Sequence, residues 1–260
     1  MSYTVNRMVL DLSHHNTIES WSAIVSAGIA GIIHKASEGD YNTDYTYTER
    51  RSAALANGLE WGAYHFGTND QVGAQVDLFL EAAKPDADTL ICLDWEPYGD
   101  KTMSTEQARE WIAEVEERLG RPGECVIYSG NLAKEELGNE VDEFFGSRRL
   151  WLAHYSSDPT VQASWDGFWL WQYSDGVAGP DPHGCPGVSG AVDTNSYDGG
   201  KGQLVAEWAR GDHELEPAPS PEPAPAPEPV PEPEPEATET ITITITVKAP
   251  AGVKIAVNTG

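Results

Sequence analysis

The chain has 260 residues, enough for one α/β barrel and an appendage, and its 42 acidic and 16 basic residues give a formal charge of −26. Because phosphate binding needs clustered Lys and Arg, this balance argues against a nucleic-acid partner. The sequence has no apolar run long enough to predict membrane insertion. Its polar N-terminus does not have the pattern of a signal peptide, so we expect synthesis in a cytoplasm. The three cysteines are widely spaced and predict neither a zinc site nor a disulfide framework.

The first half of the chain alternates short apolar strands with amphipathic helices. We expect strands at 8–11, 31–35, 62–66 and 89–96, and helices at 21–27, 44–56, 70–83 and 105–119. Asn16 with Glu19 and Ser104 with Gln107 have the spacing of capping boxes, and Gly120 is a helix stop. This alternation predicts a parallel sheet with right-handed crossovers, closing as a barrel when eight strands are present.

Helices become sparse in the second half. Strands are expected at 124–128, 150–155, 168–173 and 191–193, with a short helix at 131–137 and a closing helix at 203–210. The fold class is therefore α/β, an irregular (β/α) barrel of the TIM-like type.

The composition changes abruptly after the closing helix. Residues 216–236 contain ten Pro and six Glu in 21 residues, which predicts an extended polyproline II spacer. The strict alternation of Ile and Thr from Ile241 to Val247 then predicts a strand, followed by a turn and a second strand at 253–257. We thus expect a barrel at 1–211, a Pro/Glu-rich linker at 212–238 and a small C-terminal β segment at 239–260. Because a lone hairpin is marginal in water, we expect this segment to pair with other copies of itself or with a partner surface.

The strand at 89–96 ends in two carboxylates. Side chains alternate faces along a strand, so Asp94 and Glu96 point the same way. Asp11 and Asp193 also lie at the expected C-terminal ends of strands. In a barrel those ends converge on one face, which predicts four acids at one mouth. Crowded carboxylates repel, so at least one should keep its proton near neutrality, as glycosidic cleavage requires.

Seven ordered blocks of the chain resemble those of glycoside hydrolase family 25, the Chalaropsis-type lysozymes or N-acetylmuramidases. The blocks are 8–16, 35–39, 62–66, 93–96, 151–155, 171–174 and 192–195, and the resemblance spans about 9–208. It implies an irregular β/α barrel that hydrolyses the β-1,4 bond between N-acetylmuramic acid and N-acetylglucosamine in bacterial peptidoglycan, without a cofactor. A catalytic domain followed by a Pro-rich linker and a small module resembles the phage endolysins of the family, which are made in the host cytoplasm and reach the wall at lysis.

The resemblance implies that Glu96 is the general acid. It implies that Asp94 stabilises the oxocarbenium-like transition state or orients the acetamido group, while Asp11 and Asp193 position substrate or water. The spacing of Asp94 and Glu96 fits either a retaining or an inverting enzyme, and the substrate's own acetamido group is a third candidate nucleophile.

Further candidates for sugar binding lie on or beside strand ends. These are Tyr64, Tyr128, Trp151, Tyr155 and Gln172, for which core packing is the competing interpretation. Lys35 and Glu38 are expected to form an ion pair at the mouth that either supports the structure or contacts substrate.

Other chemistries lack their motifs. The chain has no His-Glu-x-x-His for zinc, no Gly-x-Ser-x-Gly elbow and no phosphate loop. Two alternatives to a muramidase stay open, namely a chitinase-like glycosidase and a non-catalytic wall-binding protein.

Overall fold

The computed structural model describes residues 3–209, 248, 251–252, 254 and 256. The chain divides into two compact units, Met1–Glu216 and Pro217–Gly260, and the architecture given below is that of the first unit. The Pro-rich linker and both strands of the expected C-terminal β segment lie outside the described residues. No helix in the described part of the chain is long and apolar enough to cross a membrane.

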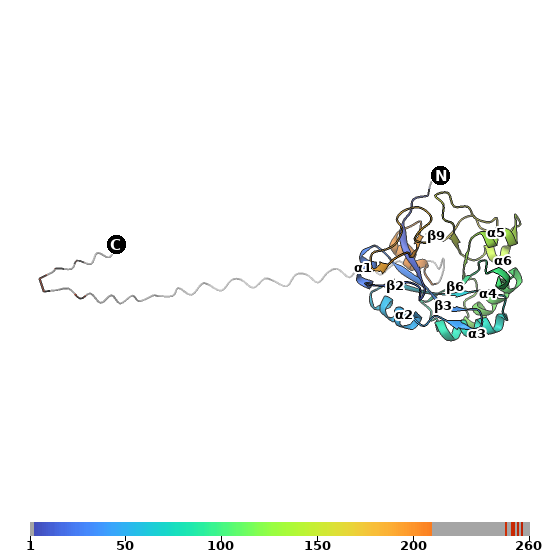
Figure 1. Cartoon of the computed structure of the whole chain (residues 1–260), viewed down its shortest axis with the longest axis horizontal. Helices are drawn as coiled ribbons and strands as arrows, with labels where there is room; N and C mark the ends of the chain where they lie inside the picture. Colours follow the sequence, from blue (N-terminus) through green and yellow to red (C-terminus); the bar gives the residue numbers. More distant parts are fainter. Residues whose placement is uncertain (1–2, 210–247, 249–250, 253, 255, 257–260) are drawn as a thin grey trace. The chain divides into compact units, whose positions relative to one another are not determined.

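Eight strands form a closed barrel, and a short strand, β4 (Asn42–Thr43), pairs with its rim (Figure 1). The barrel strands are β1 (Arg7–Leu12), β3 (Gly31–Glu38), β5 (Glu60–Phe66), β6 (Leu90–Asp94), β7 (Val126–Ser129), β8 (Leu150–Ala153), β9 (Leu170–Ser174) and β11 (Asp193–Ser196). The barrel closes because β1, the first strand in the sheet order, also pairs with β3. A separate ribbon of β2 (Thr17–Ile18) and β10 (Val188–Ser189) was not expected from the sequence.

The barrel is not wholly parallel. From β1 through β9 the barrel neighbours run parallel, but β11 runs antiparallel to both β1 and β9. The expectation that Asp193 ends a parallel strand is therefore wrong, because it is the first residue of β11. An antiparallel strand begins where its neighbours end, so Asp193 still lies at the mouth, opposite Asp11 in the register.

The helices cover the outside of the first half of the barrel and are short in the second half. They are α1 (Trp21–Ser26), α2 (Tyr47–Ala56), α3 (Val72–Ala83), α4 (Thr105–Leu119), α5 (Asn131–Leu137), α6 (Glu143–Gly146) and α7 (Lys201–Glu207). The capping box of Ser104 and Gln107 and the left-handed Gly120 bound α4 as the sequence predicts. The other expected box is wrong, since Ser20 caps α1 and Asn16 instead accepts a hydrogen bond from the Ser13 amide.

Alternation along the strands separates two cores. On β6, Leu90 and Cys92 belong to the cluster inside the barrel, whereas Ile91 and Leu93 belong to the cluster beneath the helices. Because Asp94 follows Leu90 and Cys92 at a spacing of two, it points inward at the end where the parallel strands stop. We call this end the mouth and the opposite end the bottom.

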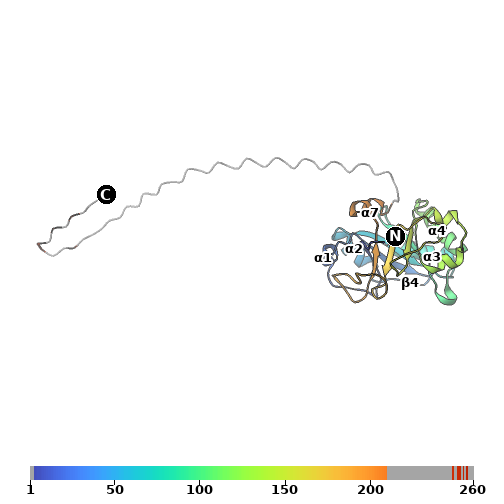
Figure 2. The same cartoon turned by 90° about the horizontal axis from the view of Figure 1, so that it is seen from above.

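The bottom is closed by α7 and the residue that follows it (Figure 2). Trp208 is 1% exposed, packs with Val9 and Leu90, and donates a hydrogen bond from its indole to the Trp61 carbonyl. A Cβ at Gly31 would lie 2.4 Å from the Trp208 ring, so this position of β3 accepts only glycine without rearrangement. The inside of the barrel is thus a packed core that Trp208 closes at the bottom.

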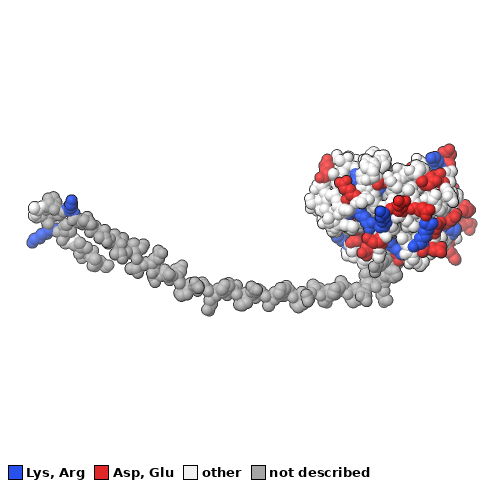
Figure 3. All heavy atoms as spheres, turned by 90° about the horizontal axis from the view of Figure 1, so that it is seen from below, with Lys and Arg blue, Asp and Glu red and all other residues white. Residues whose placement is uncertain are grey.

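Charge is mixed on the surface. Figure 3 shows Lys and Arg lying among Asp and Glu on the face that it presents. The acidic excess of the chain therefore does not form a continuous field on that face.

Candidate active site

A pocket of 180 Å³ opens at the mouth of the barrel. All four predicted acids line it, together with five of the predicted sugar-binding residues. Its lining is Asp11, Tyr64, Asp94, Glu96, Tyr128, Trp151, Tyr155, Gln172 and Asp193. The pocket therefore brings together residues from seven strands, with Glu96 and Tyr155 from the loops that follow β6 and β8.

The β6 strand places the first two acids. It ends at Asp94, two residues earlier than expected, so Glu96 lies in the loop beyond the strand. Trp95 between them points outward and stacks on Phe145 at 5.3 Å between ring centroids. Its backbone is held to β7, because its N–H donates to the Tyr128 carbonyl at 2.9 Å and its carbonyl accepts from the Ser129 hydroxyl at 2.7 Å. This anchorage keeps both carboxyl side chains on the pocket side.

Asp94 and Glu96 share an environment that disfavours ionisation. Burial, followed by the charge of Glu96, raises the pKa of Asp94 well above its ordinary value. Burial and the charge of Asp11 also raise the pKa of Glu96, which Lys35 partly offsets. Two carboxyl groups placed in this way titrate as a pair and keep a proton at a pH where an isolated carboxyl has lost it. Among the described residues, no group donates to or accepts from the buried Oδ1 of Asp94.

Asp11 and Asp193 form the second pair. They face each other across β1 and β11 and share a side-chain hydrogen bond. Burial raises the pKa of Asp193 to about 9, with the charge of Asp11 adding to the rise. Burial also raises the pKa of Asp11, but hydrogen bonds from Asn195 and Gln172 limit that rise to about 6. The two amides donate to Asp11 and favour its carboxylate form, so the proton that this buried pair shares lies on Asp193.

Two amides hold the ionised Asp11. Gln172 Nε2 donates to both of its carboxylate oxygens at 3.1 Å, and Asn195 Nδ2 donates to Oδ2 at 2.8 Å. The amides are oriented in turn, since the Tyr128 and Tyr155 hydroxyls each donate to Gln172 Oε1 at 2.7 Å. The tyrosine hydroxyls therefore fix which end of the Gln172 amide faces Asp11.

Asn195 is a site residue that the sequence interpretation missed. It is fully buried, and its Oδ1 accepts the indole N–H of Trp151 at 2.6 Å, so its amide nitrogen must point toward Asp11. The signal was present in the sequence, because Asp193 and Asn195 are two residues apart and share a face of β11. Trp151 likewise acts through Asn195 in this structure, in addition to lining the pocket.

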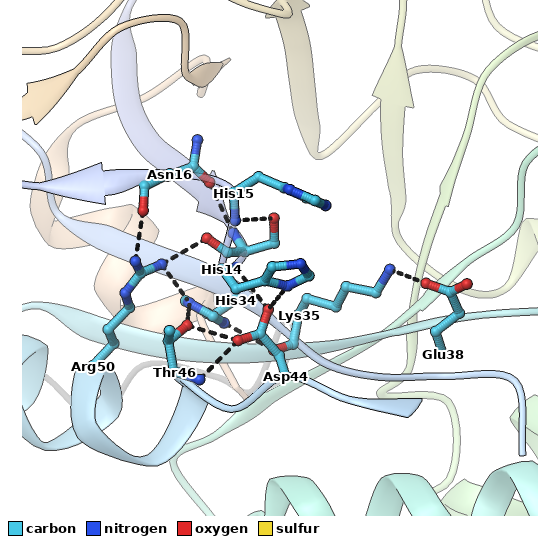
Figure 4. Close-up of polar contacts among 10 residues, drawn as sticks. His14, His15, Asn16, His34, Lys35, Glu38, Asp44, Thr46 and Arg50 are labelled. Carbon is cyan, nitrogen blue, oxygen red and sulfur yellow. Dashed lines mark hydrogen bonds and ion pairs between the residues drawn. The ribbon is translucent and has the colours of Figure 1, made fainter. Parts of the chain in front are cut away.

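Lys35 and Glu38 do not line the pocket but form the expected ion pair at its edge (Figure 4). The Lys35 ammonium lies 4.8 Å from the Phe66 ring centroid, and its charge lowers the pKa of both Asp94 and Glu96. The pair is therefore close enough to Asp94 and Glu96 for the Lys35 charge to favour their ionised forms.

A second polar cluster fixes the loop that follows Asp11 (Figure 4). Arg50 donates to the carbonyls of Ser13 and Asn16, each at 2.6 Å. Burial opposes ionisation of Asp44, but hydrogen bonds from Thr46 and His14 nonetheless lower its pKa to about 2. The carboxylate holds the His14 backbone N–H at 2.7 Å and its ring Nδ1 at 3.0 Å. These contacts support the end of β1, from which Asp11 enters the pocket.

A closed β/α barrel whose mouth holds two proton-sharing carboxyl pairs defines a carboxylate-dependent glycoside hydrolase. Comparison with known proteins agrees with this class. The family model described as "Glycosyl hydrolases family 25" matches residues 10–181, and the chain belongs to this family.

Relatives and solved structures point the same way. Lysozyme M1 of Streptomyces globisporus is 30% identical over 211 residues, covering 76% of this chain and 69% of its own. The crystal structure of the bacterial lysozyme from Streptomyces coelicolor is 30% identical with a TM-score of 0.67, covering 79% of this chain and 98% of its own. The family GH25 lysozyme from Aspergillus fumigatus is 25% identical with a TM-score of 0.65, and the match covers 80% of this chain and 100% of that one. The protein is accordingly a glycoside hydrolase of the lysozyme type, acting on peptidoglycan.

Proposed function

We propose that the protein is an N-acetylmuramidase that cleaves the β-1,4 bond between N-acetylmuramic acid and N-acetylglucosamine. The observation that carries the proposal is the pocket in which Asp11, Asp94, Glu96 and Asp193 meet. The family membership and the lysozyme relatives support the same substrate class.

In the proposed reaction Glu96 donates its proton to the oxygen of the departing sugar. Glu96 is the better placed acid because it is the more exposed member of its pair and lies in the loop beyond β6, where a polymer can reach it. The raised pKa of this pair keeps the proton available near neutrality.

Asp94 has a different role in this proposal. Its buried Oδ1, which has no partner among residues 3–209, is an acceptor ready for the N–H of a substrate acetamido group. Accepting that hydrogen bond favours the ionised form of Asp94 and so transfers the shared proton to Glu96. The ionised Asp94 then stabilises the positive charge that develops on the sugar ring.

Asp11 and Asp193 complete the site. Since Gln172 and Asn195 hold Asp11 as a carboxylate, it adds negative charge beneath the oxocarbenium-like sugar and orients substrate or water. The protonated Asp193 is a hydrogen-bond donor at neutral pH, and it directs that hydrogen to Asp11.

Replacing Glu96 with Gln tests this assignment. We expect Glu96→Gln to reduce lysis of wall suspensions by roughly 10²- to 10⁴-fold while the fold and sugar binding persist. Glu60→Gln is a matched control, because Glu60 is a half-buried carboxyl at the start of β5, at the bottom of the same barrel. Near-normal turnover by the Glu96 variant would remove it as the acid.

The products distinguish the proposed bond from the alternatives. A muramidase leaves N-acetylmuramic acid at the new reducing ends of peptidoglycan, whereas a chitinase-like enzyme releases fragments from unmodified N-acetylglucosamine chains. Binding to purified walls without release of soluble fragments would favour a non-catalytic wall-binding protein.

We also propose that the enzyme serves as a phage endolysin, made in the host cytoplasm and released to the wall at lysis. The order of a catalytic barrel, a Pro-rich stretch and a short β-patterned tail supports this role. Production inside a bacterial host, with and without permeabilisation of the inner membrane, tests it. Lysis only after permeabilisation is expected, and lysis without it would contradict the proposal.

A further inference from the structure

Exposed tyrosines gather around the mouth. Among the described residues, Tyr41, Tyr45, Tyr98 and Tyr155 are 51%, 80%, 41% and 40% exposed, and each lies in a loop that follows a strand. The pocket of 180 Å³ is smaller than the roughly 300–1,000 Å³ usual for small-molecule sites, so most of a polymeric substrate must rest outside it. Aromatic side chains on the rim are suitable surfaces for sugar rings because their apolar faces are accessible.

Two of these tyrosines form one structure with a lysine. We name Tyr41, Tyr98 and Lys101 the tyrosine ledge. The Tyr41 hydroxyl donates to Glu38 at 2.9 Å, and Tyr98 also hydrogen-bonds Glu38, so one carboxylate fixes both rings. The Lys101 ammonium lies 5.0 Å from the centroid of the Tyr41 ring.

Two further contacts hold the rings of the ledge in place. The Phe66 ring packs edge-on against Tyr98 with centroids 5.1 Å apart, and a Cβ at Gly39 would lie 2.5 Å from the Tyr41 ring. Since Gly39 has a φ of +55°, glycine satisfies both the backbone and the close approach of the ring. The tyrosines are therefore exposed but fixed in position, which lowers the entropic cost of binding a ligand on them.

The ledge lies on the Glu96 side of the pocket. Tyr98 follows Glu96 by two residues, and Glu38, which holds both tyrosines, is paired with the Lys35 whose charge acts on Glu96. An acid must stand next to the oxygen that it protonates, and the departing sugar carries that oxygen. The surface next to Glu96 and outside the pocket therefore faces the departing part of the strand.

Lys101 gives the ledge a charge preference. It is exposed and, within the described part of the chain, makes no ion pair, whereas Lys35 is committed to Glu38. An ammonium with no carboxylate partner among the described residues, beside a sugar-sized aromatic surface, is a local binding point for an anionic group of the ligand. Peptidoglycan carries such groups, because every second sugar bears a lactyl carboxylate or a peptide attached to it.

We propose that the tyrosine ledge is the subsite for the departing strand, in which Tyr98 packs on the released N-acetylated sugar and Lys101 binds the carboxylate borne by the next sugar. This inference rests on the proposed function for the direction of the strand. It adds the residues that recognise the acidic substituent of the departing strand.

Binding measurements test the role of Tyr98 separately from the role of Lys101. In a Glu96→Gln background, calorimetry would compare a tetrasaccharide of alternating N-acetylglucosamine and N-acetylmuramic acid, with free lactyl carboxylates, against chitotetraose, which has none. Tyr98→Ala should weaken both ligands roughly three- to tenfold. Lys101→Gln should weaken only the carboxylated ligand, and added salt should remove that difference.

Matched controls lie at the bottom of the barrel. Tyr3→Ala removes an exposed tyrosine that packs on Phe168 near the start of β9, and Lys201→Gln removes an exposed lysine whose charge acts on Glu60. Neither control should change the affinity for either ligand. In the chain that keeps Glu96, Tyr98→Ala should raise KM on soluble glycan and leave kcat within about twofold of the parent value.

The results that would overturn the tyrosine ledge differ from those that would overturn the proposed function. Unchanged affinity in Tyr98→Ala and Lys101→Gln, or equal losses of both ligands in Lys101→Gln, would overturn the ledge even if the enzyme cleaves walls. Failure of the unmodified chain to release reducing ends from walls would instead remove the muramidase, whatever the ledge binds.

Discussion

At the bottom of the barrel the indole of Trp208 is almost completely buried and its N–H is hydrogen-bonded, whereas at the mouth the Asp94 carboxyl is 7% exposed and one of its oxygens has no partner among the described residues. Both ends use the same strands. At the bottom a large apolar side chain fills the core and its one polar atom has a partner, while the mouth collects four carboxyl groups whose pKa values burial raises. The difference teaches that stability and chemistry are separated along the barrel axis, as in other β/α barrels.

The separation predicts that a change at the bottom affects stability alone. Trp208→Ala removes a large buried side chain and should lower the free energy of unfolding by about 3–5 kcal/mol. Denaturant titration would measure this loss, and turnover per folded molecule should be nearly unchanged. A variant that is as stable as the parent but catalytically impaired would show that the two ends are not separate.

A change at the mouth should lower the activity and raise the stability. Asp193→Asn keeps a hydrogen-bond donor toward Asp11 but removes an acid whose pKa is about 9 in the folded chain and near 3.8 in the unfolded chain. The unfolded state loses that proton between these two values while the folded state keeps it. Asp193 therefore reduces stability progressively as the pH rises from about 4 to about 9.

The Asp193→Asn variant should consequently be less active and more stable. We expect a Tm raised by roughly 2–4 °C at pH 8, no gain at pH 4, and a rate lowered by about tenfold or more. Calorimetric scans at the two pH values check the sign. A Tm lowered equally at both would mean that Asp193 is a structural residue.

The smallest predicted effect concerns the residue behind the pocket wall. Trp151→Phe keeps the aromatic ring but removes the indole N–H that orients Asn195. The Asn195 amide oxygen then loses its donor, the amide is held less firmly toward the ionised Asp11, and the pKa of Asp11 should rise further. We expect a two- to tenfold loss in kcat, with the acidic limb of the pH–rate profile moved to higher pH.

A purely structural role for Trp151 gives a different result. In that case Trp151→Phe would lower the Tm without moving the pH–rate profile. A second check is Asn195→Ala, which should move the profile in the same direction because it removes the same donor to Asp11.

Much of the mouth could be predicted from the sequence because strand periodicity is local. The alternation of Asp94, Trp95 and Glu96 is the one that a strand predicts, although Glu96 lies just beyond β6, and the bounds of α4 follow from its caps. These features depend on neighbouring residues along the chain, which a single sequence displays directly.

Features that depend on residues far apart in the chain could not be predicted from the sequence. The direction of β11 depends on its pairing with β1 and β9, and nothing local in residues 193–196 reports it. The role of Asn195 depends on Trp151, 44 residues earlier, and on Asp11, 184 residues earlier. The early end of β6 likewise depends on how the loop after Asp94 meets β7.

Titration of the carboxyl carbons by NMR, in protein labelled at Asp and Glu, tests the central claim most directly. Single substitutions at Asp11, Asp94, Glu96 and Asp193 would assign the signals of the mouth. We predict that at least one mouth carboxyl remains protonated above pH 6, and that Asp193→Asn removes the signal that titrates highest in its pair. If all four carboxyl groups titrate below pH 5, the mouth does not hold a proton at neutrality, and the acid chemistry proposed for it is contradicted.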